Sequence, residues 1–116
     1  PQLILIGSGS EVSVCVDAAA RLTEKGVATR VVSMPSWDLF EAQPESYRRS
    51  IFPGGVARLS VEAGATLGWE RYAHRSVGID RFGASAPGAT VLHHLGINVD
   101  NVVDQAQRLL AERGTR

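Results

Sequence analysis

The chain has 116 residues, the size of one ordinary domain and long enough to bury a hydrophobic core without disulfides or metals. Hydrophobic residues make up 44% and charged residues 21%, a globular composition that argues against intrinsic disorder. The formal net charge is zero and no long run of one sign occurs, so neither a nucleic-acid partner nor an anionic membrane surface is expected.

The first predicted element is a buried strand over Leu3–Ile6, a continuous apolar run of the kind found in parallel sheets. Ser8 and Glu11 have the spacing of a capping box and predict that a helix starts there. Gly26 predicts the end of this helix as its C′ residue. The helix has an apolar face, formed by Val12, Cys15, Ala19 and Leu22.

The middle of the chain predicts two more strands with a helix between them. The second strand covers residues 27–33, and residues 35–38 interrupt the pattern after it. A helix is expected over residues 44–50, with the proline in its first turn and a Pro-Gly-Gly stop at 53–55. The third strand follows over residues 56–61.

A short helix carrying Trp69 and Tyr72 is expected next, with Thr66 as its cap, and then a fourth strand over residues 75–79.

Two helices complete the predicted order. Ser85 is the N-cap candidate of a helix that runs to His94, with Pro87 in its first turn. Asn98 caps the last helix and Gly114 ends it. The apolar face of this last helix consists of Val99, Val102, Val103, Ala106 and Leu109 or Leu110.

Strands that alternate with helices predict an α/β fold, a three-layer α/β/α arrangement with a mostly parallel sheet of about four strands. No linker or repeat divides the sequence, so residues 1–116 are expected to form a single domain. No apolar stretch is long enough to span a bilayer, and no signal peptide is visible. Because Pro1 lies inside an apolar run, we expect the chain to belong to a longer polypeptide.

The turn formed by Gly7, Ser8, Gly9 and Ser10 is a candidate anion-binding site. Free amides at a helix N-terminus attract phosphate or sulfate, and ligands of α/β proteins bind at the carboxyl ends of strands. The turn has neither the three-glycine dinucleotide pattern nor the Walker lysine. The alternative interpretation is a tight turn with a capping box and no ligand.

Two further side chains have a chemical and a structural interpretation. Glu62, at the end of the third strand, could act as a base or cation ligand, or it could accept loop amides or pair with an arginine. Cys15 could be a nucleophile if a histidine folded onto it, or it could be a small buried residue of the core. As the single cysteine, Cys15 excludes an internal disulfide, which suits a reducing cytoplasm.

The histidines do not predict a metal site. His93 and His94 are adjacent on a predicted helix and point about 100° apart, whereas helical zinc ligands are usually three or four residues apart. His74 is distant in the sequence.

Aromatic and basic residues recur through the chain. The aromatic residues suggest a ligand pocket, core packing or a surface against a partner domain: Trp37, Phe40, Trp69, Tyr72 and Phe82. Five arginines are interpreted as scattered salt-bridging surface residues, with a phosphate site as the minor alternative: Arg48, Arg49, Arg71, Arg75 and Arg81.

Several stretches are distinctive sequence motifs: Gly7–Val12, Met34–Ser36 followed by Phe40, Gln43, Tyr47 and Arg48, then Val61–Gly64, Leu67–Tyr72 and Phe82–Pro87. In these stretches, which extend over nearly the whole chain, the sequence closely resembles the C-terminal domain of transketolases. Related domains occur in pyruvate dehydrogenase β chains and deoxyxylulose-phosphate synthases. The Gly-Trp-Glu-Arg-Tyr and Phe-Gly-Ala-Ser-Ala-Pro motifs resemble transketolase more than they resemble those two families.

The resemblance implies a parent enzyme that transfers a two-carbon ketol unit from a ketose phosphate to an aldose phosphate in the pentose phosphate pathway. It implies a cytoplasmic homodimer that uses thiamine diphosphate and a divalent cation, magnesium or calcium. In that family the N-terminal and middle domains hold the cofactor, the metal and the catalytic groups. We therefore expect no catalytic, cofactor-binding or metal-binding residue in this chain, and the other domains of the parent as its partners.

In that family the domain begins with an additional antiparallel edge strand, which this chain starts too late to contain. The four remaining strands would lie in the order second, first, third, fourth. The second strand, residues 27–33, is therefore expected at an edge of the sheet, where it would pair with another chain or be covered.

Three hypotheses follow for function. The first is a non-catalytic structural, and potentially regulatory, domain of a transketolase. The second is a free-standing phosphate- or nucleotide-binding module that uses the turn from Gly7 to Glu11. The third is a hydrolase based on Cys15 or Ser8, although the turn does not continue as the Gly-x-Ser-x-Gly elbow.

Overall fold

The computed structural model describes residues 1–9, 11–62, 68–78 and 97–114. Helices and strands alternate along the chain, as the sequence predicts. In chain order the elements are β1 (Leu3–Gly7), α1 (Glu11–Glu24), β2 (Thr29–Ser33), α2 (Trp37–Glu41), α3 (Glu45–Ile51), β3 (Ala57–Glu62), the 3-10 helix η1 (Trp69–Arg71), β4 (Arg75–Gly78) and α5 (Val99–Glu112).

The four described strands form one parallel sheet in the order β2-β1-β3-β4. β1 pairs on both sides, and its Leu5 lies opposite Val31 of β2 and Leu59 of β3. Within the described chain β2 has a neighbour on one side only. These observations confirm the α/β fold, the mostly parallel sheet and the predicted edge position of the second strand.

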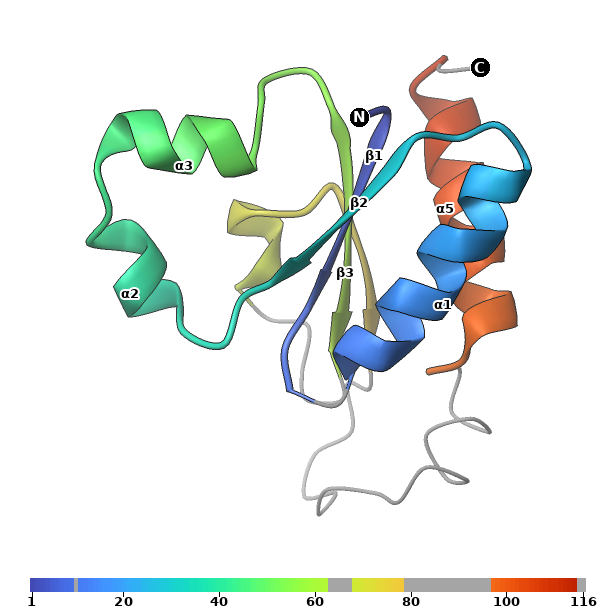
Figure 1. Cartoon of the computed structure of the whole chain (residues 1–116), viewed down its shortest axis with the longest axis horizontal. Coiled ribbons are helices and arrows are strands. Elements are labelled where there is room, and N and C mark those ends of the chain that lie inside the picture. Colours follow the sequence, from blue (N-terminus) through green and yellow to red (C-terminus); the bar gives the residue numbers. More distant parts are fainter. Residues whose placement is uncertain (10, 63–67, 79–96, 115–116) are drawn as a thin grey trace.

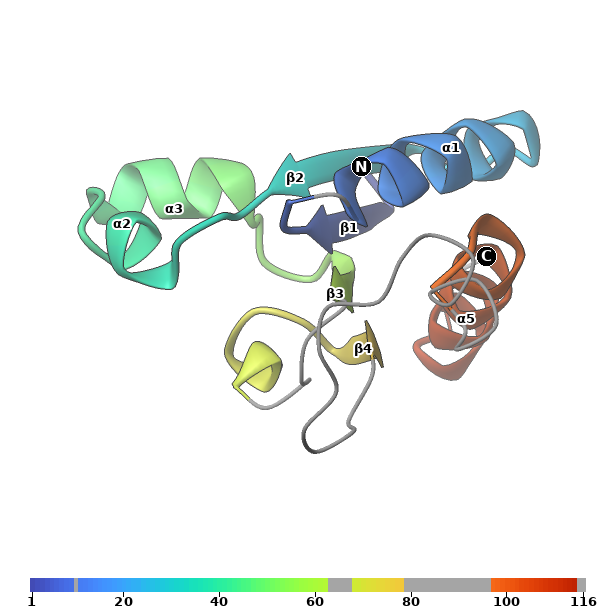
Figure 2. The same ribbon diagram turned by 90° about the horizontal axis from the view of Figure 1, so that it is seen from below.

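Helices cover both faces of this sheet (Figures 1 and 2). α1 and α5 lie on one face, and α2, α3 and η1 lie on the other. Because successive side chains of a strand point to opposite faces, Leu3 and Leu5 pack under α1 and α5, whereas Ile4 and Ile6 pack under the second layer. All four side chains are fully buried, which explains the continuous apolar run.

The start of α1 differs from the prediction of a capping box. A capping box on Ser8 requires helical backbone at the next residue, but Gly9 has a φ of 58°, in the left-handed region. The helix therefore begins at Glu11, and the carbonyl of Ser8 accepts a turn-type bond from the Glu11 amide at 3.3 Å. The predicted end is confirmed, since Gly26 has a φ of 89°.

The connection from β2 to β3 contains α2, a helix that the sequence does not predict. Its N-cap is Ser36, whose hydroxyl accepts the amide of Leu39 at 3.2 Å. α3 then runs over Glu45–Ile51, with Pro44 at its N-cap, close to the predicted range. α2 and α3 together, called the helical arm below, extend to one side of the sheet (Figure 1).

The last helix matches its prediction closely. The Asn98 side chain accepts the Asn101 amide at 2.8 Å, and Gly114 follows the helix with a φ of 71°. Thr66, Ile79 and the predicted helix from Ser85 to His94 lie outside the described residues.

Both ends of the described chain lie at the amino-terminal edge of the sheet (Figure 1). Pro1 directly precedes β1. At the end of α5, the Arg113 guanidinium donates to the Gly55 carbonyl at 3.4 Å, two residues before β3 begins.

Gly68 fixes the helical arm against η1, and its replacement tests this packing. A Cβ on Gly68 would lie 2.6 Å from Cη2 of Trp37, and the residue has a φ of 91°. Gly68→Ala is expected to lower the free energy of unfolding by about 2–4 kcal/mol, the sum of the left-handed penalty and overpacking.

The matched control is Gly26→Ala, where φ is 89° but no atom lies within 4 Å of the added Cβ. Its cost in urea denaturation should be about 1–2 kcal/mol. Equal costs for the two variants would contradict a packing role for Gly68.

Candidate functional site

The carboxyl ends of β1 and β3 form the topological switch point of the sheet. The chain leaves β1 through α1 toward β2, and leaves β3 through η1 toward β4, on opposite faces. Ligands of open α/β sheets bind in the crevice outside such a point. Ser8 follows β1 and Glu62 ends β3, so these two residues stand on either side of the crevice.

A hydrogen bond joins the two sides of this crevice. The hydroxyl of Ser8 donates to a carboxylate oxygen of Glu62, 54 residues away in the sequence. This contact supports the structural interpretation of Glu62, as an acceptor at the loop. A pocket of about 430 Å³ opens beside the pair, with Trp37 and Trp69 in its lining.

The other residues of the turn serve close packing. A Cβ on Gly7 would lie 3.1 Å from Sγ of Cys15 and 3.2 Å from the amide nitrogen of Val12, so only glycine lets α1 approach the end of β1 this closely. Ser10, the fourth residue of the candidate anion site, lies outside the described residues.

Two carboxylates lie at this turn. Glu62 accepts from Ser8, and Glu11 is 5% exposed with its Oε2 3.9 Å from where a Cβ on Gly9 would lie. Their negative charges oppose the binding of an external anion beside them. The anion site at Gly7–Ser10 stays a prediction.

Cys15 is a buried residue of the core, as its structural interpretation expects. Burial raises the pKa of its thiol to about 12, with the charge of Glu11 as a further cause. A buried thiol of this kind is a poor nucleophile, because the thiolate is the reactive form.

The aromatic residues form one connected cluster under the helical arm. Trp37 packs edge-on against Trp69 with ring centroids 5.2 Å apart, and Phe40 packs edge-on against Tyr72 at 5.6 Å. Phe52, which the sequence analysis did not single out, joins them at 5.3 Å from Phe40. The cluster holds the arm on the sheet, in agreement with the core-packing interpretation, whereas Phe82 lies outside the described residues.

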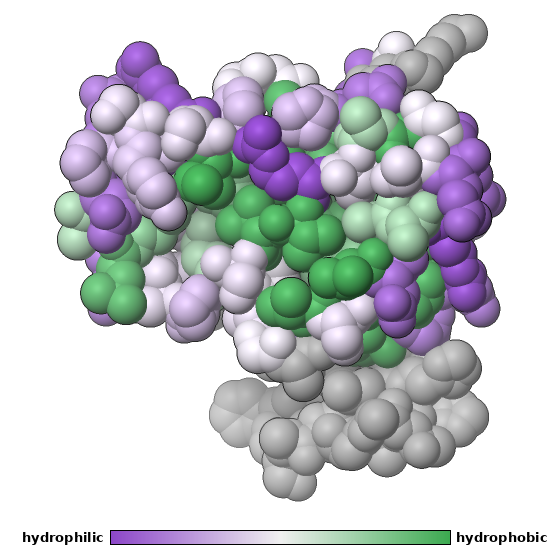
Figure 3. Space-filling model, in the orientation of Figure 1, coloured by the Kyte–Doolittle hydropathy of each residue, from purple (hydrophilic) through white to green (hydrophobic). Residues whose placement is uncertain are grey.

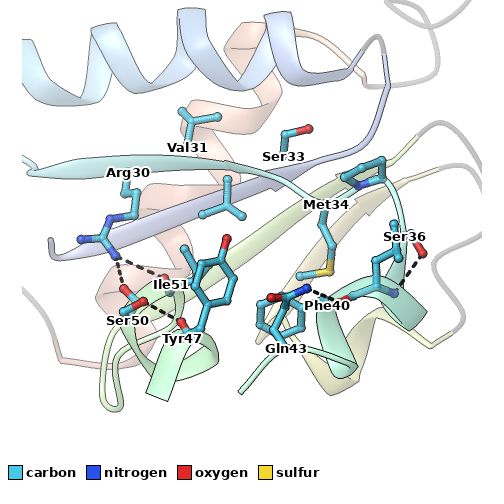
Figure 4. A pocket seen from close by; sticks show the side chains of 13 residues that line it. Arg30, Val31, Ser33, Met34, Ser36, Phe40, Gln43, Tyr47, Ser50 and Ile51 are labelled. Carbon is cyan, nitrogen blue, oxygen red and sulfur yellow. Dashed lines mark hydrogen bonds between the residues drawn. The ribbon is translucent and has the colours of Figure 1, made fainter. Parts of the chain in front are cut away.

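A second, larger pocket of about 740 Å³ runs along the free edge of β2, and we call it the edge groove. Figure 4 shows its lining from β2 on one side and from the helical arm on the other. Arg30 fixes the arm there, since its guanidinium donates to the carbonyls of Ser50 and Ile51 at 3.0 and 3.2 Å.

The edge groove combines apolar side chains, such as Met34 and Ile51, with polar ones, such as Arg30 and Gln43. In Figure 3 hydrophobic surface occupies the middle of the face, between the helical arm and α1. Leu39 and Tyr47, both lining the edge groove, are 66% and 49% exposed. An apolar surface beside an unpaired strand edge is typical of an interaction site.

Arg48 and Arg71 pair with Glu41, and Arg49 pairs with Glu45, as the salt-bridging interpretation expects. These three arginines are clustered, however, and not scattered. Arg48, Arg49 and Arg71 line one pocket together with Arg58, because α3 and η1 pack on the same side of β3. Arg75 forms ion pairs as expected, with Glu112. Arg81 lies outside the described residues.

Among the described residues, no group of three or more histidine, cysteine, aspartate or glutamate side chains could hold a metal ion. His74 accepts the backbone amide of Arg58 through Nδ1 at 3.0 Å. Its pKa is lowered, first by burial and then by the charges of Arg113 and Arg58. His93 and His94 lie outside the described range. No helix in the described part of the chain is long and apolar enough to cross a membrane.

Comparison with known sequences matches residues 1–98 to the family described as transketolase-like C-terminal domain. The chain is 51% identical over 114 residues to a transketolase of a Nostoc species, covering 95% of this chain and 17% of that protein. It is 48% identical over 116 residues to the Geobacillus stearothermophilus transketolase, covering 97% of this chain and 17% of the relative.

Solved structures of transketolases are similar to this chain as well. Transketolase from Leishmania mexicana superimposes with a TM-score of 0.88 at 47% identity, covering 96% of this chain and 16% of that chain. A Pichia stipitis transketolase in complex with sedoheptulose 7-phosphate also gives 0.88, at 36% identity over 98% of this chain and 17% of that chain. The chain thus spans only 16 or 17% of the length of these relatives.

A double-mutant cycle tests the Ser8–Glu62 contact. Ser8→Ala and Glu62→Ala are each expected to lower the free energy of unfolding by about 1–2 kcal/mol, because a partly buried bond to a carboxylate is lost. The coupling energy should be about 1 kcal/mol. The exposed Arg108–Asp104 pair is the control, with coupling of about 0.3–0.5 kcal/mol. Purely additive effects at Ser8 and Glu62 would contradict the contact.

The thiol of Cys15 is expected to react slowly with a disulfide reagent. With a pKa of about 12 folded and 9.0 unfolded, its thiolate fraction at pH 8 falls roughly a thousandfold on folding. The stability that this raised pKa contributes is complete below pH 9 and is lost as the pH rises toward about 12. Equal rates in buffer and in denaturant would show that the thiol is accessible in the folded chain.

Proposed function

The chain belongs to the family of transketolase-like C-terminal domains, and from that premise we propose that it is a non-catalytic structural domain of a transketolase. The parent enzyme would transfer a two-carbon ketol unit from a ketose phosphate to an aldose phosphate in the pentose phosphate pathway. It would act as a cytoplasmic homodimer with thiamine diphosphate and magnesium or calcium.

The observation that carries this proposal is the apolar surface at the free edge of β2. The edge groove, with the exposed Leu39 and Tyr47, is a surface suited to covering by another polypeptide segment. The relatives are about six times as long as this chain, so the remaining polypeptide of the parent, including the additional edge strand of the family's domain, would supply the occupant. The domain would act by packing against this polypeptide through the edge of β2.

The residues of the crevice do not fit the cofactor of the parent. A diphosphate and its metal require cationic or amide donors for the phosphates and oxygen ligands for the cation. At the carboxyl edge of the sheet, where a ligand would bind, the carboxylates of Glu62 and Glu11 face the loop instead. Glu62 is engaged with Ser8, and Cys15 is buried in the core. We therefore propose that cofactor and metal are held by other domains.

The test is a transketolase assay of the chain alone, beside calorimetry with thiamine diphosphate and magnesium. The expected result is no ketol transfer, because the crevice at the carboxyl edge of the sheet does not suit the cofactor. A full-length transketolase in the same buffers is the positive control. Turnover by the chain, or saturable binding of thiamine diphosphate that excess inorganic phosphate does not displace, would contradict the proposal, and Glu62→Gln would then test whether the crevice is responsible.

A further inference from the structure

A third pocket, of about 280 Å³, lies between the helical arm, β3 and η1. Four guanidinium groups and two carboxylates line it, which leaves a net charge of +2: Arg48, Arg49, Arg58, Arg71, Glu41 and Glu45. Its volume lies at the lower limit of pockets for drug-sized molecules, so it suits one small anionic group.

Two of the arginines lie within ion-pair distance of Glu41. Its carboxylate lies 3.3 Å from the Arg48 guanidinium and 3.9 Å from that of Arg71. The Tyr72 hydroxyl donates to the same carboxylate at 2.5 Å. Burial, as the larger cause, and this hydrogen bond raise the pKa of the Tyr72 hydroxyl to about 12. The negative charge of Glu41 is thus balanced inside the pocket.

Arg58 has no such partner. Within the described part of the chain no carboxylate lies within ion-pair distance of its guanidinium, which stacks over the Phe52 ring at 5.6 Å. Arg71 stacks over Tyr72 at the same distance, and the two rings have centroids 6.3 Å apart. The two stacked cations are therefore neighbours on a shared aromatic wall.

Two of the arginines that line the pocket also have a hydrogen-bond donor that no described residue accepts. The Nε atoms of Arg48 and Arg58 are buried, and neither has an acceptor among the described residues. A buried donor without an acceptor is unfavourable, so a rotation of either side chain that brings its Nε–H to an oxyanion would gain a hydrogen bond. Burial and the nearby charge of Arg113 lower the pKa of Arg58, which agrees with a cation that lacks a counter-charge.

We propose that this pocket, called the arginine pocket, binds a small oxyanion, the phosphoryl group of a small phosphorylated molecule. Guanidinium groups match the oxygens of a phosphate in a two-pronged geometry, and a doubly charged phosphate balances the net charge of +2. Arg58 would be the principal ligand, with Arg48 and Arg71 beside it. This site is separate from the edge groove and independent of the structural role proposed above.

The experiment is a titration of the whole chain with inorganic phosphate at low ionic strength, followed by the NMR signals of the arginine Nε–H groups and by calorimetry. Saturable shifts at Arg58 and Arg48 are expected. Arg58→Gln should weaken phosphate binding at least tenfold. The control Arg108→Gln removes the same charge from an exposed side chain on α5 and should change the affinity less than twofold.

A second variant is expected to bind phosphate more tightly, a result that a loss of folded structure would not produce. Glu41→Gln removes the internal carboxylate that competes for Arg48 and Arg71, so phosphate should bind several-fold more tightly. Succinate at matched ionic strength distinguishes a phosphate site from a general carboxylate site, and phosphate should bind more tightly. Shifts that are linear and equal at Arg58 and Arg108, or an Arg58→Gln variant that binds like the unsubstituted chain, would overturn the proposal.

Discussion

The double pairing of β1 is the constraint on which the rest of this molecule depends. Leu3, Leu5, Ile4 and Ile6 are fully buried, in alternate directions, between the two helical layers. Both neighbouring strands take their register from β1. The end of β1 also sets the position of Ser8 opposite Glu62. A single apolar tetrapeptide thus orders the sheet, separates the two cores and places the crevice.

The sequence predicts the repeating part of this fold well. Apolar runs and terminal residues such as Gly26 and Asn98 act locally, so their consequences can be read without tertiary information. The start of α1 could not be predicted in this way, because a glycine adopts helical and left-handed backbone about equally readily, and the sequence does not show that Gly9 has a φ of 58°. The short α2 was also not predictable from the sequence. Its five residues are too few for a stable isolated helix, and the packing of Trp37 and Phe40 stabilises it.

The candidate sites were harder to predict than the fold, because they are built from residues that are distant in the sequence. Ser8 and Glu62 were each singled out, but their contact follows only from the adjacency of β1 and β3. Arg58 lies in a strand and draws no attention in the sequence, although it completes the arginine pocket. Each of the three pockets described above is lined in part by residues between β2 and β3, the segment with the weakest sequence pattern.

The position of both chain ends at the amino-terminal edge of the sheet has a practical consequence. Pro1 lies there and so does Arg113, whereas the crevice of Ser8 and Glu62 opens at the opposite edge. A tag or reporter protein fused to either end would therefore project away from the crevice. Molecules immobilised on a sensor through such a tag would all present the same edge to the surrounding solution, which makes the orientation of the domain an experimental choice.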